Sequence, residues 1–112
     1  MCLLALFFRV AEDAAVVAGA NREEFYLRGG EPPRLLEGRV SAVAGVDPTA
    51  GGSWLGVNAN NLLVAVTNRR KTEVPPSPRS RGLLVREMLS CSSASAAIEH
   101  AVCSLEQNTY DG

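Results

Sequence analysis

Four residues of the chain have side chains that could act together in acyl transfer. Cys2 follows Met1, Arg22 and Glu23 follow the second apolar segment, and Asn68 follows a later one. If Met1 is removed, Cys2 carries a thiol and a free α-amine, and an ordinary pKa of about 7.7–8.0 leaves part of that amine unprotonated near neutral pH. Such an amine can take the proton of the nucleophile on its own residue. The side-chain amide of Asn68 could donate a hydrogen bond to an oxyanion.

Each of these residues also has an ordinary structural interpretation. A cysteine is often a small apolar core residue. An Arg-Glu pair at a turn is often a solvated ion pair. A strand-end asparagine often bonds the local backbone. The residue types alone therefore leave both interpretations open.

A second set of residues could bind a ligand without reacting with it. Asn21 begins the same polar segment, and Trp54 could line a pocket wall or lie in the core. Arg69, Arg70 and Arg81 flank a proline-containing loop and could clamp a carboxylate or a phosphate. A solvated connection is the alternative interpretation of that loop.

Composition argues against several other kinds of site. The chain has 11 Lys and Arg residues against 12 Asp and Glu residues, so it offers no general attraction for nucleic acid. Its three cysteines lack the spacing of a metal site or a disulfide framework, so we expect no metal and no cofactor. The apolar start has no basic leader, and no apolar run reaches the ~18 residues that span a bilayer, so we expect neither a signal peptide nor an integral membrane segment. A reducing, cytoplasmic setting is the simplest expectation.

The elements that must position the candidate residues begin with two apolar segments. Residues 2–10 form a nearly continuous apolar run, which predicts a short strand buried on both faces. Residues 14–20 form a second such run, and the short connection favours a hairpin at the centre of a sheet. Such a hairpin returns residues 21–23 to the neighbourhood of Cys2.

The middle of the chain predicts further strands joined by turns. Residues 21–39 are polar and contain Gly29-Gly30 and Pro32-Pro33, which predicts irregular backbone. Residues 40–46 predict a third strand, followed by a turn-rich loop. A second hairpin is then predicted from residues 54–57 and 62–67, joined through an asparagine-rich turn at 58–61.

The C-terminal part predicts a basic, proline-rich loop over residues 69–81 and two helices within residues 82–106. The first helix is expected over residues 82–90. The second has Ser95 as a candidate N-cap and one apolar stripe formed by Ile98, Ala101, Val102 and Leu105, with His100 off the stripe as a solvated residue. Strands within 2–67 followed by helices favour a single α+β or layered α/β domain over residues 1–112.

Five ordered motifs resemble the NRDE (Asn-Arg-Asp-Glu) proteins, also called the transport and Golgi organization protein 2 family. They are Met1-Cys2 with its apolar run, residues 20–26, residues 45–47 with 51–57, residues 67–68, and residues 79–85. The family is similar to N-terminal-nucleophile hydrolases, which implies a four-layer αββα sandwich. It also implies Cys2 as nucleophile, Arg22 as its neighbouring charge, Glu23 as a supporting acid and Asn68 as an oxyanion donor.

Two departures from the family pattern affect what the resemblance implies. Position 23 is usually aspartate and is glutamate here. The extra methylene moves the carboxylate by about one bond length, and displacements of about 1 Å matter to catalytic geometry. The chain also stops where family members continue into further strands, so it resembles a truncated N-terminal portion of the sandwich. An uncovered sheet of this kind could lead to self-association.

Three functional interpretations follow from the resemblance. The first is a cysteine amidohydrolase that cleaves a carbon–nitrogen amide bond in a small molecule. The second is a non-catalytic binding or trafficking protein for an amphipathic anion such as haem or an acyl lipid. The third is an inactive truncated product. The resemblance also implies a mitochondrial or Golgi-associated location beside the cytoplasmic one.

Overall fold

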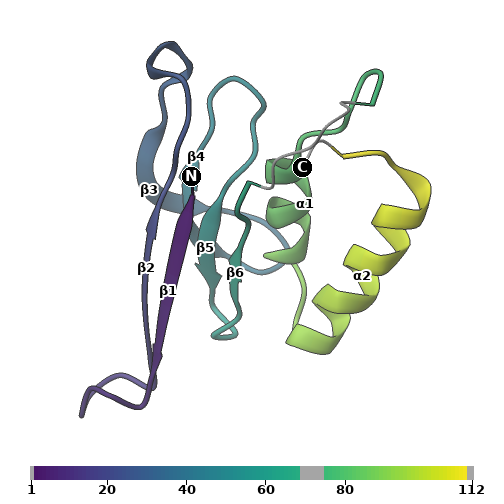
Figure 1. The fold of residues 1–112 in the computed structure, drawn as a ribbon. Coiled ribbons are helices and arrows are strands. Elements are labelled where there is room, and N and C mark those ends of the chain that lie inside the picture. The colour runs from purple at the N-terminus through teal and green to yellow at the C-terminus, as the bar shows by residue number, and fades with distance from the viewer. Residues whose placement is uncertain (1, 69–74, 111–112) are drawn as a thin grey trace.

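The structure is a computed structural model, and it describes residues 2–68 and 75–110 (Figure 1). Its elements are β1 (Leu3–Phe8), β2 (Val16–Asn21), a 3₁₀ turn η1 (Tyr26–Arg28), β3 (Glu31–Leu36), β4 (Ala42–Val46), β5 (Leu55–Asn58), β6 (Leu63–Ala65), α1 (Arg81–Met88) and α2 (Ala94–Gln107). They form a mixed α+β fold of two antiparallel sheets and two helices, which agrees with the predicted fold class.

Strands β1 and β2 form the predicted N-terminal hairpin, with Leu3 opposite Asn21 and Phe8 opposite Val16. Within the described residues, however, the hairpin is a two-stranded sheet by itself. Leu3 and Phe8 are each 67% exposed, so the prediction of a central strand buried on both faces is wrong for the chain as it stands. An apolar strand is buried only when other layers pack on it, and the described part of the chain leaves these side chains open to solvent.

The second sheet has the strand order β3-β4-β5-β6. Strand β3 lies within residues 21–39, where irregular backbone was predicted, so that prediction is wrong for residues 31–36. Pro32 and Pro33 fit there because β3 is an edge strand, which needs ladder hydrogen bonds on one side only. The pairing with β4 also shifts register between Glu31 and Arg34, as expected around residues that cannot donate.

The hydrophobic core lies between one face of the β3-β4-β5-β6 sheet and α1. Its buried residues are Leu36, Ala42, Ala44, Val46, Val64, Val85 and Leu89. Gly56 of β5 allows the close approach, because a Cβ there would lie 2.7 Å from Leu89 Cδ1 and 2.7 Å from Ala44 Cβ. Ala42, Ala44 and Val46, at alternate positions of β4, thus belong to the core face of the sheet.

Helix α1 begins against the turn that precedes β5. The Ser80 hydroxyl caps the helix by accepting from Gly82 N–H at 3.2 Å, and Ser53 N–H donates to Gly82 O at 2.9 Å. A Cβ at Gly52 would overlap the backbone of Gly82, so this contact requires glycine at position 52. The first turn of α1 is therefore fixed to the sheet.

Helix α2 packs through small residues and leaves its apolar stripe exposed. Its N-cap is Ser93, which accepts from Ala96 N–H, so the expected cap at Ser95 is wrong by two residues. Ala97 and Ser104 are the buried residues of the helix. The members of the predicted stripe other than Ala101 face solvent, with Ile98 61%, Val102 52% and Leu105 58% exposed.

A polar cluster joins the two helices to the segment that follows α2. Arg79 donates to Tyr110 Oη at 2.8 Å and pairs with Glu87, while Ser104 Oγ and Tyr110 Oη are 2.7 Å apart. His100 Nε2 lies 3.0 Å from Glu87, so this exposed histidine also has one polar contact. The hydrogen bond from Arg79 lowers the pKa of Glu87 below its ordinary value despite partial burial.

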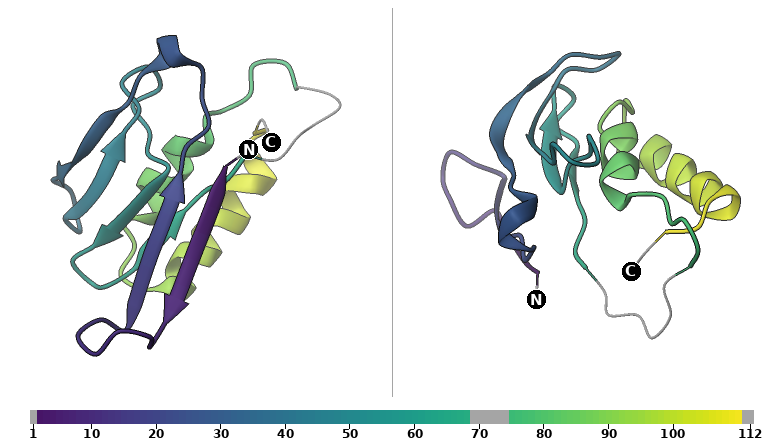
Figure 2. Two further views of the ribbon diagram at one scale, coloured as in Figure 1. Left: turned by 60° about the vertical axis from the view of Figure 1, so that its left-hand side comes forward. Right: turned by 90° about the horizontal axis from the view of Figure 1, so that it is seen from above.

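The helices lie on the side of the β3-β4-β5-β6 sheet that is turned away from the N-terminal hairpin (Figure 2). The sheet therefore lies between the helices and the N-terminal hairpin. None of the helices within residues 2–68 and 75–110 has the length and apolar character needed to cross a membrane.

The core predicts the effect of shortening one side chain. Leu89 is 1% exposed and packs on the sheet through Gly56, so Leu89→Ala should lower the free energy of unfolding by about 2–4 kcal/mol. Urea unfolding followed by circular dichroism measures the change. The matched control is Leu105→Ala, at a position 58% exposed, for which a change within about 0.5 kcal/mol is expected. Equal losses for the two variants would contradict this assignment of the core.

Candidate functional site

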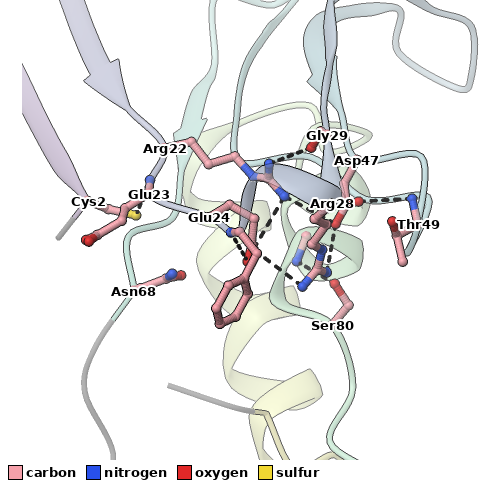
Figure 3. A network of polar contacts seen from close by, with 12 residues as sticks. Cys2, Arg22, Glu23, Glu24, Arg28, Gly29, Asp47, Thr49, Asn68 and Ser80 are labelled. Carbon is pink, nitrogen blue, oxygen red and sulfur yellow. Dashed lines mark hydrogen bonds and ion pairs between the residues drawn. The ribbon is translucent and has the colours of Figure 1, made fainter.

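The N-terminal hairpin brings Cys2 beside the polar segment that follows β2. Leu3 N–H donates to Asn21 Oδ1 at 2.8 Å across the hairpin. Glu23 N–H donates to Cys2 Sγ at 3.4 Å, and Figure 3 shows the two residues side by side. Two of the predicted catalytic residues and one predicted ligand-binding residue therefore meet at one end of the hairpin.

The guanidinium of Arg22 points away from Cys2, toward Gly29 and Asp47 (Figure 3). It donates to Gly29 O at 2.8 Å and lies 3.5 Å from Glu24 and 3.8 Å from Asp47. The guanidinium was expected beside the thiol of Cys2, and it instead contacts the oxygens of Gly29, Glu24 and Asp47. The charge of Arg22 is thus directed away from Cys2.

Trp54 supports Arg22 on the sheet face opposite the helical core. The guanidinium carbon lies 4.9 Å from the centroid of the indole ring, which is a cation–π contact. The ring itself rests on Gly45, where a Cβ would lie 2.7 Å from Trp54 Cη2. Glycine at position 45 therefore makes room for the indole, and the indole in turn positions the arginine.

Asp47 joins the turn η1 to the end of β4. Its side chain is 9% exposed and accepts from Arg28 at 2.9 Å. Thr49 N–H donates to its other oxygen at 3.0 Å. Burial by itself raises the pKa of Asp47, but the hydrogen bonds from Arg28 and Thr49 and the charge of Arg28 outweigh it and lower that pKa below 3.8.

Two adjoining hollows border the polar contacts of Arg22, Arg28 and Asp47. The smaller, of about 40 Å³, is lined by Cys2, Leu3, Leu4, Ala20, Asn21, Arg22, Glu23, Glu24, Trp54, Ala65, Val66, Thr67 and Asn68. All four predicted catalytic residues, together with Asn21 and Trp54, therefore border a single hollow. It has room for a reacting group of a few atoms.

The larger hollow, of about 340 Å³, shares Arg22, Glu24, Trp54, Val66 and Asn68 with the smaller one. Its charged lining comes from Arg22, Glu24, Arg28, Asp47, Arg79 and Arg81. Arg81 Nη2 donates to Asn68 Oδ1 at 2.8 Å, so this predicted ligand-binding residue contacts a predicted catalytic one. The other two predicted anion-binding residues, Arg69 and Arg70, lie outside the described residues.

The residues around the smaller hollow have the types that acyl transfer needs. A thiol such as that of Cys2 can act as a nucleophile, and a side-chain amide such as that of Asn68 can donate to an oxyanion. Within residues 2–68 and 75–110, no three His, Cys, Asp or Glu side chains are placed to hold a metal ion.

Sequence reasoning missed Arg28, Asp47 and Glu24 as members of the site. Glu24 lies 3.4 Å from Arg28, and both fall in the stretch predicted to be irregular. Asp47 was placed in a turn and in the motif at residues 45–47 without a role in the site, and its side chain accepts the Asx-type bond from Thr49 N–H. The signal available was an acidic residue directly after an apolar strand, because a carboxylate drawn toward the interior needs a cationic partner.

Comparison with known proteins identifies relatives along the whole chain. A family model described as Transport and Golgi organisation 2 matches residues 1–112. The chain is 31% identical over 121 residues to the mouse Transport and Golgi organization 2 homolog. It is 30% identical over 121 residues to the bovine and human Transport and Golgi organization protein 2 homologs. Each alignment covers 100% of this chain and 43% of the relative. No solved structure matches.

The depressed pKa of Asp47 predicts a pH-dependent contribution to stability. Its folded pKa lies below the ordinary value of 3.8, so the contribution is fully present above pH ~4 and is lost as pH falls through the folded pKa. Asp47→Asn should lower the free energy of unfolding at pH 7 by about 1–3 kcal/mol and flatten its dependence on pH below ~4.

Urea unfolding between pH 2.5 and 7, followed by the fluorescence of the single tryptophan, measures both effects. Asp13→Asn, in the exposed turn of the N-terminal hairpin, is the matched control. A slope against pH that is the same in Asp47→Asn and in the unmodified chain would contradict the assignment.

Proposed function

The chain belongs to the Transport and Golgi organisation 2 family, and on this premise we propose that Cys2 is the nucleophile of an amide-cleaving site. One observation carries the proposal: Cys2 and Asn68 border the same small hollow although 66 positions separate them, from 2 to 68. The chain spans 43% of the length of its relatives, so the proposal concerns the residues that this part supplies.

The reaction begins once removal of Met1 has exposed the α-amine of Cys2. The amine takes the thiol proton, and the sulfur forms a bond to the amide carbonyl carbon. The carbonyl oxygen becomes an oxyanion that the Asn68 amide N–H stabilises. The proton then passes to the leaving nitrogen as the carbon–nitrogen bond breaks, and water hydrolyses the thioester.

Arg22 and Glu23 have different roles in this proposal. Arg22 shapes the wall of the hollow, because its guanidinium is held by Gly29 O and stacked on Trp54. Glu23 fixes the nucleophile through its backbone N–H, which donates to Cys2 Sγ. We assign its carboxylate the orientation of the α-amine, the role that the resemblance gives to the aspartate usual at this position.

An activated ester tests the nucleophile without knowledge of the natural substrate. With 4-nitrophenyl acetate, we expect acetylation of the N-terminal peptide, located by mass spectrometry, and its loss in Cys2→Ala. Asn68→Ala should slow acetylation roughly 10²–10³-fold, the usual effect of removing an oxyanion donor. Cys103→Ser, at an exposed cysteine, is the control and should keep the reaction. Acetylation of Cys103 with none at Cys2 would refute the proposal.

The larger hollow supports a second candidate function, the binding of an amphipathic anion such as haem or an acyl lipid. Arg22, Arg28, Arg79 and Arg81 line it together with Glu24 and Asp47, which leaves a net charge of two positive units among these six groups. Guanidinium groups bind carboxylates and phosphates through paired hydrogen bonds. A binding function of this kind needs no reaction at Cys2.

Titration with an acyl-CoA tests the second candidate. Trp54 lines both hollows, so binding should change its fluorescence saturably. Replacing Arg69 and Arg70 by Gln should raise the dissociation constant roughly tenfold, equal to about 1.4 kcal/mol. The control is Arg9→Gln, at an exposed hairpin position. An unchanged dissociation constant in the Arg69/Arg70 variant would count against these two residues as the anion clamp.

A further inference from the structure

Asn68 lies between the two hollows. It lines both of them, whereas Cys2 lines only the smaller and Arg81 only the larger. Asn68 therefore shares one hollow with Cys2 and the other with Arg81. Which edge of its side-chain amide faces Cys2 decides whether the residue can stabilise an oxyanion.

A side-chain amide is a donor on one edge and an acceptor on the other. Asn68 is exposed, so a rotation of its side chain could present the oxygen to Cys2 and repel an oxyanion. Arginine has only donors, and Arg81 Nη2 donates to Asn68 Oδ1 at 2.8 Å. This charge-assisted bond holds the oxygen on the Arg81 side and leaves the amide nitrogen on the opposite edge.

The first turn of α1 fixes the backbone from which Arg81 extends. Ser80 caps the helix, and Ser53 N–H donates to Gly82 O at 2.9 Å. On the preceding side, Arg79 is bound by Glu87 and Tyr110. Hydrogen bonds on both sides of residue 81 therefore hold the backbone from which the Arg81 side chain reaches Asn68.

We propose that Arg81 is a positioning residue that orients the Asn68 amide so that its N–H edge faces Cys2. The inference rests on the proposed nucleophile function and assigns Arg81 a role beyond that of an anion clamp. It states that Arg81 acts on the reaction through Asn68, without contact with the reacting atoms.

Two reagents separate positioning of an oxyanion donor from general effects on the thiol. In acetylation by 4-nitrophenyl acetate, the sulfur bonds to the carbonyl carbon, an oxyanion forms, the thiol proton passes to the α-amine, and 4-nitrophenolate leaves. In alkylation by iodoacetamide, the sulfur bonds to a methylene carbon, iodide leaves and no oxyanion forms. Only the first reaction depends on the Asn68 donor.

Arg81→Met should therefore slow acetylation of Cys2 at least roughly tenfold, within the ~10²–10³-fold effect of losing a donor, and leave alkylation of Cys2 unchanged. Arg81→Lys keeps a donor and should recover part of the rate. In an Asn68→Ala background, Arg81→Met should have no further effect. The matched control is Arg34→Met, an arginine whose side chain is 57% exposed.

Three results would overturn the inference: an unchanged acetylation rate in Arg81→Met, equal slowing of acetylation and alkylation, or slowing of the same size in the Asn68→Ala background. The side-chain amide signal of Asn68 in a ¹H–¹⁵N spectrum tests the orientation separately. It should shift in Arg81→Met and not in Arg34→Met, and an unshifted signal would also refute the inference. A chain that is alkylated but never acetylated at Cys2, with the amide shift present, would refute the proposed nucleophile function and leave the orienting contact established.

Discussion

The buried carboxylate of Asp47 links the β3-β4-β5-β6 sheet to the end of the N-terminal hairpin through ion pairs with two arginines. It binds Arg28 directly at 2.9 Å and lies 3.8 Å from Arg22, which follows β2. A charge in this position is costly without partners, so the carboxylate and the arginines require one another. Through Arg22 and Trp54 the interaction places the polar segment beside Cys2 over the sheet face opposite the helices. The geometry of both hollows depends on that arrangement.

Much of the fold could be predicted because its determinants are local. The two hairpins and the two helices follow from short apolar segments, asparagine-rich turns and serine caps. Strand β3 could not be predicted in this way, since prolines break most strands and only its edge position tolerates them. The exposure of Phe8 and Leu105 could not be predicted either. Apolar patterning shows which side chains favour burial, but it does not show whether another sheet or helix packs over them.

The sequence motifs could predict which residues belong to the candidate site. They could not predict the side-chain contacts between residues that lie far apart in the chain. Residue type and position single out Cys2, Glu23 and Asn68, the resemblance implies their roles, and the hairpin register explains why the first two meet. The direction of the Arg22 side chain depends on Gly29 and Trp54, which lie 7 and 32 positions further along the chain. The contact of Arg81 with Asn68 likewise depends on how α1 docks on the sheet, which no local pattern encodes.

The central claim is that the mature chain presents a thiol and an α-amine on the same residue, next to the Asn68 amide. The intact mass of the chain purified after expression in cells tests it most directly, because the chemistry requires that Met1 be absent. The account predicts a mass lacking one methionine, with Cys2 as the first residue in N-terminal sequencing. A mature chain that retains Met1 would contradict it, since the amine would then belong to a residue without the nucleophile.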